Sequence, residues 1–347
     1  MTSKLRVVNA TATGLTLFVM LFFMTALKSY AQSDAHIEVR PSPLSEPTEI
    51  PFHLLNPKIP RIIVYLSIND SKKLPFLVDT GFNGSLLLFK TMSKQVEEVQ
   101  EPDSSLTGNK NSERTVVLNT VDLPAVSSSS PLSLRNLPVL LSDWEPGRDK
   151  KPKISGLIGL SIFHFGVITV NFDKQVMTLS EGVPAWGKYA EAEPCVLKME
   201  EGLIYAKIRV GDRKIWALLD TGSEISTLPS ELAEEFGEMT DVKVRLDTIE
   251  GALSAALYRV SGITLGDQPQ PPINAAAFPS ALPTIGLDIL SRYNFSLDIA
   301  NLRLYLVPRR SREIKANPAV PAKRTKTRTA VERQGASKPP IFARRVW

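Results

Sequence analysis

Two stretches of the sequence place an aspartate directly after an apolar run and follow it with threonine and glycine: "FLVDTG" ends in Asp79-Thr80-Gly81, and "ALLDTG" ends in Asp220-Thr221-Gly222. A lone carboxylate in an apolar setting loses its hydration, which is costly. Two carboxylates about 3 Å apart share one proton instead, because both cannot ionise together. The ionised member can then take a proton from a water that attacks a peptide carbonyl, while the protonated member donates a hydrogen bond to the carbonyl oxygen. Glycine after the threonine lets the backbone approach the carboxylates closely.

The elements that precede both aspartates are an internal repeat. Residues 62–81 ("IIVYLSINDSKKLPFLVDTG") and 203–222 ("LIYAKIRVGDRKIWALLDTG") each predict a strand, a polar turn, a second strand and the Asp-Thr-Gly motif. Asn69-Asp70 and Gly211-Asp212 are typical of hairpin turns. The repeat therefore predicts the same β unit twice.

A second shared element follows each copy. Residues 156–179 and 283–306 align without a gap through "IGL", and each continues as a strand, a turn and another strand. The motif glycines are Gly159 and Gly286, which lie 80 residues after Asp79 and 66 residues after Asp220. Two copies of one β unit predict two lobes, and lobes that face each other would bring Asp79 and Asp220 together near a pseudo-twofold axis.

The doubled series of Asp-Thr-Gly and apolar-apolar-Gly elements resembles the pepsin/retropepsin superfamily of aspartic proteases, over roughly residues 55–308. The two-copy order is similar to a pepsin-like bilobed enzyme, and the short lobes with "GLDIL" look more like bacterial two-lobed retropepsin-like proteins. The resemblance implies a mainly β, bilobed acid-protease fold made of two tandem retropepsin-like β-barrel lobes, active as a monomer. It also implies the following site: the catalytic pair Asp79 and Asp220; the active-site loop residues Thr80, Gly81, Thr221, Gly222 and Ser223; and the strands beneath the loops at Gly159 and Gly286.

The two copies differ in places that matter for this site. Ser223 follows the second motif, as expected for a hydroxyl that supports the carboxylate, whereas Phe82 follows the first, where we expect it to line a pocket instead. Asp288 in "GLDIL" is Ser161 in the first copy. In this family a hairpin flap closes over the substrate, and the candidates are Thr248–Leu257 in lobe two and Thr107–Arg114 in lobe one.

The N-terminal residues are of a different kind. Lys4 and Arg6 precede an apolar run of 13 residues, "LTLFVMLFFMTAL", and small residues follow it up to Ala31. This pattern is typical of a secretory signal peptide, and a retained membrane anchor is the alternative. We expect a signal peptide (1–31), a connecting arm (32–54), an N-terminal protease lobe (55–185), a C-terminal protease lobe (194–308) and a basic disordered tail (309–347).

Charge is distributed unevenly along the chain. The tail carries 12 Lys and Arg against two acids, whereas residues 32–308 carry 26 basic and 34 acidic residues. The tail is predicted to be a solvated extension; the alternatives are contact with an anionic envelope surface and contact with the acidic body. Nucleic acid is an unlikely partner for an exported chain, and the tail lacks an RNA-binding aromatic pattern.

Other catalytic classes lack their motifs. The single Cys195 excludes an intramolecular disulfide and CxxC motifs, and predicts a buried or linker thiol. An exported chain without disulfides suits a bacterial periplasm. The three histidines are scattered, with His164 expected in the core, and there is no HExxH, GxSxG or P-loop motif. We therefore expect no metal and no cofactor.

These features together predict an exported aspartic endopeptidase that hydrolyses peptide bonds through a water activated by Asp79 and Asp220. Its substrate would be a protein or peptide bound as an extended strand in the cleft between the lobes. The alternative is a non-catalytic peptide-binding or scaffolding module with the same fold.

Overall fold

The computed structural model describes residues 47–55, 60–89, 114–126, 132–142, 153–163, 166–183, 189, 192–248, 251–309 and 345–346. The predictions for the signal peptide, most of the connecting arm, the flap candidate in lobe one, His164 and most of the basic tail lie outside these residues. No helix in this described part of the chain has the length and apolar character needed to cross a membrane.

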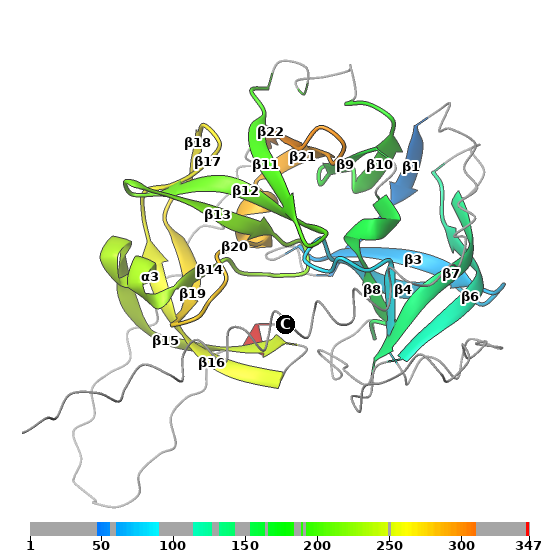
Figure 1. Cartoon of the computed structure of the whole chain (residues 1–347), viewed down its shortest axis with the longest axis horizontal. Helices are drawn as coiled ribbons and strands as arrows, with labels where there is room; N and C mark the ends of the chain where they lie inside the picture. Colours follow the sequence, from blue (N-terminus) through cyan, green and yellow to red (C-terminus); the bar gives the residue numbers. More distant parts are fainter. Residues whose placement is uncertain are drawn as a thin grey trace, which may run out of the picture.

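Lobe one is a closed barrel of six strands, on the right of Figure 1. Their order is β3-β4-β8-β5-β7-β6, and β6 pairs back with β3 through Ser67 and Ile68. The short strand β2 pairs antiparallel with β3. The bounds are β2 (His53–Leu54), β3 (Ile62–Ile68), β4 (Leu74–Val78), β5 (Leu86–Phe89), β6 (Arg114–Leu123), β7 (Leu132–Ser142), β8 (Gly156–Ile158) and the 3-10 helix η2 (Leu160–Phe163).

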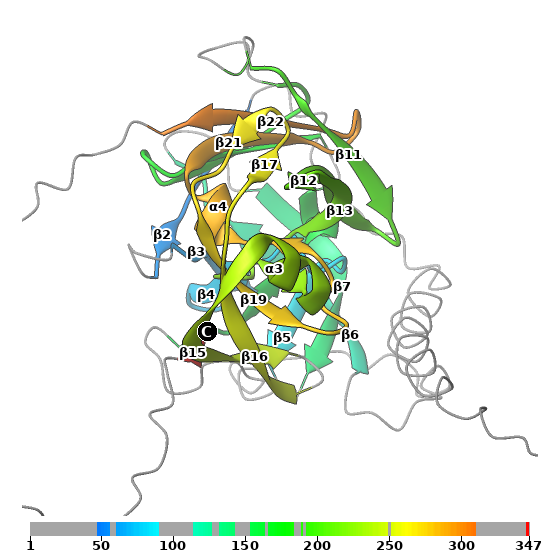
Figure 2. The same ribbon diagram turned by 90° about the vertical axis from the view of Figure 1, so that its left-hand side faces the viewer.

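Lobe two repeats this order with β12-β13-β20-β14-β19-β16. The strand β15 follows β16 at the end of this order. After a turn at Gly262, β17 pairs with β12, so the lobe closes at the place where β6 meets β3 in lobe one. The bounds are β12 (Leu203–Val210), β13 (Arg213–Leu219), β14 (Thr227–Pro229), α3 (Ser230–Phe236), β15 (Gly237–Thr248), β16 (Gly251–Val260), β17 (Ile263–Leu265), β18 (Gln268–Pro269), β19 (Ile273–Phe278), β20 (Thr284–Ile285) and α4 (Leu287–Leu290). Figure 2 shows this lobe from the side of α3, with the hairpin β15–β16 at the bottom of the view, and β23 (Arg345–Val346) pairs in parallel with β15.

An antiparallel sheet joins the lobes above the two barrels in Figure 1. Its order is β1-β10-β9-β21-β22-β11, so β9 from lobe one pairs directly with β21 from lobe two. At the centre of that pair the buried hydroxyls of Thr169 and Ser296 are 2.6 Å apart. The bounds are β1 (Thr48–Pro51), β9 (Val167–Asn171), β10 (Val176–Ser180), β11 (Cys195–Glu200), β21 (Tyr293–Asp298) and β22 (Arg303–Pro308). Cys195 is a buried thiol at the start of β11, and burial, with Asp267 nearby, raises its pKa to about 12.

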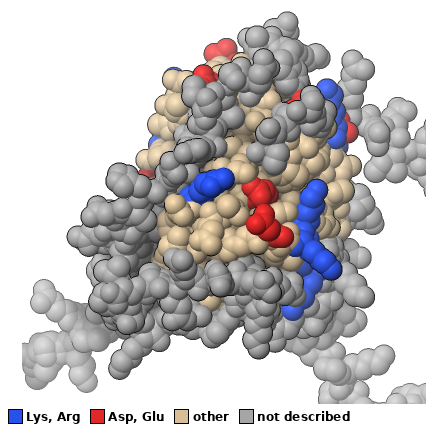
Figure 3. Space-filling view, turned by 90° about the vertical axis from the view of Figure 1, so that its right-hand side faces the viewer, with Lys and Arg blue, Asp and Glu red and all other residues tan. Residues whose placement is uncertain are grey.

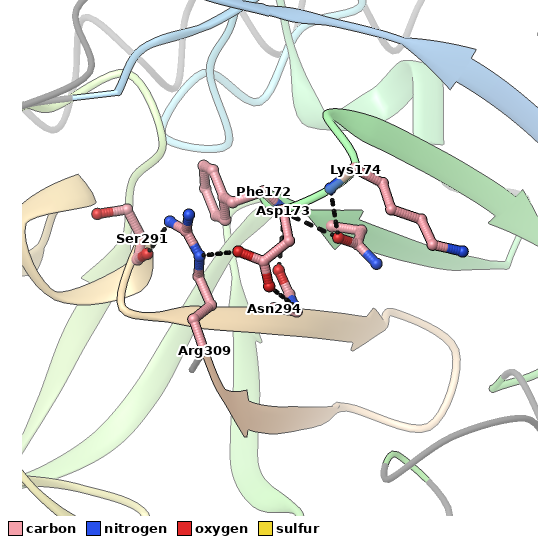
Figure 4. A network of polar contacts seen from close by, with 7 residues as sticks. Phe172, Asp173, Lys174, Ser291, Asn294 and Arg309 are labelled. Atoms are coloured by element: carbon pink, nitrogen blue, oxygen red, sulfur yellow. Dashed lines mark hydrogen bonds and ion pairs between the residues drawn. The ribbon is translucent and has the colours of Figure 1, made fainter. Parts of the chain in front are cut away.

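A polar cluster fixes the turn after β9 to the end of lobe two (Figure 4). Arg309 donates from Nε to Asp173 and from Nη1 to the carbonyl oxygen of Ser291, both at 2.8 Å. Asn294 donates to the other oxygen of Asp173 and accepts from the N–H of Phe172, also at 2.8 Å. The cluster therefore holds the two lobes in one arrangement.

Strand and turn chemistry explain these elements. In β12 apolar side chains point inward and basic ones outward, the alternation expected of a half-buried strand. β5 runs between β7 and β8 in the barrel wall, and all four of its residues are buried. Asn69 and Asp70 both have positive φ, as a type I′ hairpin turn requires. The predicted mainly β fold with two lobes is confirmed.

The negative charge of the body does not gather in one place on the face seen in Figure 3. This view shows the lobe-one side, and its described surface is mostly uncharged. A small acidic group lies near the centre of this face with basic side chains on both sides of it, and further acidic side chains lie at its top and edges.

Candidate active site

Each Asp-Thr-Gly loop begins where a buried strand of its barrel ends. In lobe one β4 runs parallel to β8, and the N–H of Asp79 donates to the carbonyl oxygen of Ile158 at 2.9 Å. In lobe two β13 runs parallel to β20, and the N–H of Asp220 donates to Ile285 at 3.1 Å. The "IGL" elements predicted to lie beneath the loops therefore hold both aspartates from below.

The two threonines join the loops to each other across the lobes. Thr80 donates from its hydroxyl to the carbonyl oxygen of Leu219 at 2.7 Å, and Thr221 donates to that of Val78 at 2.8 Å. Each hydroxyl also accepts from the other threonine's N–H, at 3.0 and 3.1 Å. Thr80 and Thr221 are 5% and 2% exposed. Because all four bonds are buried, the relative position of the two loops is tightly constrained.

The structure brings the carboxyl groups of Asp79 and Asp220 together, within hydrogen-bonding reach. Each carboxyl lies over the glycine of the opposite loop. A Cβ added to Gly81 would lie 2.7 Å from the carboxyl carbon of Asp220, and a Cβ on Gly222 would meet that of Asp79 at an equally forbidden distance. Glycine is therefore required at both positions by the close approach of the carboxyls.

The environment of Asp79 favours its protonated form. Its pKa is raised well above the usual range, first by burial and then by the charge of Asp220 and the hydrogen bond between the two carboxyls. Opposing this shift, the N–H of Gly81 donates to Oδ1 at 2.9 Å, and the N–H of Phe82 also contributes.

Asp220 has a matching set of backbone donors. Burial raises its pKa as well, and the hydrogen bond with Asp79 opposes that shift. The N–H groups of Gly222 and Ser223 both donate to Oδ1, at 2.8 and 3.1 Å. Since burial raises the pKa of both carboxyls and two adjacent carboxylates cannot both ionise, the pair shares one proton.

The residues after the two motifs make different contacts. The backbone N–H of Ser223 supports the carboxylate of Asp220, while its hydroxyl donates to the carbonyl oxygen of Ile225 at 2.8 Å. Phe82 was expected to line a pocket, but its ring is buried in the core of lobe one. A Cβ on Gly159 would lie 2.5 Å from this ring, and one on Gly84 would also collide with it.

The leucines that follow the two "IGL" glycines make equivalent contacts. The residue after each glycine donates its N–H to the loop above: Leu160 to Phe82 at 2.8 Å and Leu287 to Ser223 at 2.9 Å. A Cβ on Gly286 would lie 2.9 Å from the carbonyl oxygen of Ser223. The loops thus rest directly on the strands beneath them, as the resemblance implies.

A buried ion pair between the lobes was not anticipated from the sequence. Arg61, just before β3, places its Nε 2.6 Å from an oxygen of Glu224, and the side chains are only 5% and 9% exposed. Burial lowers the pKa of Arg61, while Glu224 and then Asp79 oppose that shift. The only signal in the sequence was the acid that directly follows "DTGS".

The flap candidate of lobe two falls on a hairpin. Within this candidate Thr248 ends β15 and residues 251–257 belong to β16, with Thr248 paired to Gly251. At the base of this hairpin Val244, Ala255, Leu257 and Ala276 form a small apolar cluster of their own. Among the described residues no group of three or more His, Cys, Asp or Glu side chains could hold a metal ion.

Comparison with known proteins agrees with this site. Residues 206–290 match the family model described as aspartyl protease, which spans β13, the second Asp-Thr-Gly loop and the second "IGL" element. This match lies within lobe two and agrees with the resemblance to the aspartic protease superfamily. A comparison with curated proteins finds no match.

Two solved structures are similar at low sequence identity. Basic 7S globulin from soybean is 10% identical with a TM-score of 0.46, over 75% of this chain and 94% of that chain. The protein described as edgp is 10% identical with a TM-score of 0.48, over 77% of this chain and 96% of that chain.

Proposed function

We propose that this chain is an aspartic endopeptidase that hydrolyses peptide bonds with a water held between Asp79 and Asp220. The observation that carries the proposal is the pair of facing carboxyls, held by the buried threonine contacts between the loops. A pair that merely ended two strands would not need glycine opposite each carboxyl.

One proton shared by the two carboxyls supports a division of roles. Asp220 accepts a proton from the water as its oxygen forms a bond to the peptide carbon. Asp79 donates its hydrogen bond, and then its proton, to the carbonyl oxygen, where negative charge develops. When the C–N bond breaks, Asp220 passes its proton to the leaving amine and Asp79 regains the proton from the hydroxyl. Both carboxyls are then restored.

An extended peptide is the substrate that fits this arrangement. A strand in the cleft would pair through its main chain with the hairpin β15–β16, in the mode of strand addition. We also propose that the protein is exported, as its N-terminal pattern predicts, and acts as a monomer, because both aspartates are supplied by one chain.

The test is cleavage of a diverse peptide mixture by the purified chain between pH 3 and 7, the range expected for a coupled carboxylate pair. Asp79→Asn and Asp220→Asn are compared with Asp212→Asn, whose side chain is 86% exposed in a turn. Cleavage by the parent and the Asp212 control, and by neither other variant, is the expected result. Cleavage that survives in both dyad variants would disprove the mechanism. A folded parent that binds peptides but cuts none would favour the binding module instead.

A further inference from the structure

A largely buried carboxyl is connected by hydrogen bonds to the strand that supports the Asp220 loop. Asp288, the second residue of α4, accepts a hydrogen bond from the hydroxyl of Ser226 at 2.7 Å. The same hydroxyl accepts from the N–H of Gly286 at 3.1 Å. Gly286 follows Ile285, whose carbonyl oxygen accepts from the N–H of Asp220. Three hydrogen bonds and the peptide bond between Ile285 and Gly286 therefore connect the two acids.

Nothing in the dyad chemistry uses Asp288, yet its burial is costly. Ser226 is 1% exposed, and the second oxygen of Asp288 is buried without a hydrogen-bond partner. Burial raises the pKa of Asp288 to about 6, opposed by the hydroxyl of Ser226, the charge of Arg292 and the N–H of Ser226. Arg292 is the one charged group in the described chain that acts on this carboxyl to a resolved extent. A carboxyl retained under these conditions needs a reason.

Lobe one shows that the scaffold does not need this acid. The equivalent of Ser226 is Ser85, whose hydroxyl donates to the carbonyl oxygen of Pro138 at 2.7 Å. Gly159 donates its N–H to the backbone oxygen of Ser85, at 2.9 Å, instead of to the hydroxyl. The equivalent of Asp288 is Ser161, whose hydroxyl is buried without a partner. The loop of Asp79 is therefore supported by backbone, and only the loop of Asp220 is supported through a hydroxyl and a carboxyl.

We propose that Asp288 is a positioning residue for Asp220: its carboxyl orients the hydroxyl of Ser226, which holds the N–H of Gly286 and so fixes the strand on which the Asp220 loop rests. This inference rests on the proposed function for its effect on catalysis, although the effect on Asp220 itself does not depend on activity. A hydroxyl has one proton, so donation to Asp288 leaves its lone pairs free for Gly286. Without an acceptor at 288 the hydroxyl is free to rotate, and the contact with Gly286 loses its fixed direction.

The first readout is kinetic. Asp288→Ala and Ser226→Ala are expected to lower kcat roughly tenfold with KM within about twofold, because small displacements of a reacting group cost rate more than binding. Asp288→Asn retains an acceptor for Ser226 but cannot ionise. It is therefore expected to keep most of the parent's kcat and to lose any pH dependence of kcat centred near the pKa of Asp288. Ser161→Ala, the matched change in lobe one, is expected to leave kcat unchanged.

The second readout needs no activity. Carboxyl signals of Asp79 and Asp220 are followed by NMR against pH in the parent and the four variants. The Asp220 titration is expected to shift in Ser226→Ala and Asp288→Ala and to stay in place in Ser161→Ala. A parent that cuts nothing while this shift is seen would overturn the proposed function and retain the positioning role. Titrations and kcat values equal to the parent's in Ser226→Ala and Asp288→Ala would overturn the positioning role, as would equal shifts in Ser161→Ala.

Discussion

The two lobes hold their aspartates with the same backbone contacts but surround them with different side chains. In both, the aspartate N–H bonds to the strand below, and the residue after the "IGL" glycine bonds back to the loop. In lobe one the loop continues as Phe82 and Asn83, one buried in the barrel and one polar. In lobe two it continues as Ser223 and Glu224, and lobe two also carries Asp288. The comparison teaches that a shared backbone frame and the two threonine hydroxyls pair the carboxyls, while the other side chains around the two loops differ.

The contacts between the lobes show the same difference. Arg61 before β3 meets Glu224 of the other lobe in a buried ion pair. At the pseudo-equivalent place Asn83 donates to the carbonyl oxygen of Glu201, at 2.9 Å and near the surface. The lobes thus meet through two buried charges at Arg61 and Glu224, and through a neutral hydrogen bond at Asn83.

The largest expected effect is equal in both lobes. Asp79→Asn and Asp220→Asn should each lower kcat by about 10³-fold or more, because each removes one partner of a shared proton. Cleavage assays over pH 3 to 7 measure this. A variant that keeps a tenth of the parent's kcat would show that the aspartate it replaces transfers no proton. The two lobes would then differ in their chemistry as well as in their contacts.

The next effect separates the lobes through their contacts. Glu224→Gln removes the carboxylate that is ion-paired with the buried Arg61 and should lower the free energy of unfolding by about 3–5 kcal/mol. Asn83→Ala removes a neutral, exposed hydrogen bond and should cost about 1 kcal/mol. Denaturant unfolding of both variants measures the difference. Equal losses would mean that the ion pair is no stronger than the hydrogen bond at the pseudo-equivalent position.

A third effect concerns pH and lobe two. The folded pKa of Asp288 is about 6 and lies above its unfolded value, so its stabilising contribution is present below pH 4 and is lost as the pH rises through 6. Two pKa units correspond to about 3 kcal/mol. The raised pKa values of Asp79 and Asp220 act in the same direction. Thermal unfolding should therefore occur at a higher temperature at pH 4.5 than at pH 7, by a smaller margin in Asp288→Asn. An unchanged margin in that variant would assign the whole effect to the dyad.

The smallest effect tests how Asp220 is supported. The hydroxyl of Ser223 bonds to Ile225 and not to the carboxyl, so Ser223→Ala should change kcat by less than about threefold and stability by about 1 kcal/mol. Steady-state kinetics and denaturant unfolding measure this. Phe82→Ala provides the contrast in lobe one: its buried ring leaves a cavity and should cost about 3–5 kcal/mol. A large loss of kcat in Ser223→Ala would restore the hydroxyl as the support of Asp220.

Much of the frame could be predicted because the information is local. Apolar runs predicted β3 and β12, and Asn69-Asp70 predicted the hairpin turn between β3 and β4. The order of the repeated motifs predicted which loops would meet, because two copies of one unit have equivalent faces.

The sequence by itself therefore determined the two lobes, their strands and the candidate pair Asp79 and Asp220. Only the tertiary structure decided the directions of single side chains: the ring of Phe82 toward Gly159, the hydroxyl of Ser223 toward Ile225, and Arg61 toward Glu224. The physical reason is separation along the chain. A strand follows from the alternation of neighbouring residues, whereas the partner of a buried hydroxyl or charge is chosen among groups that only packing brings within reach.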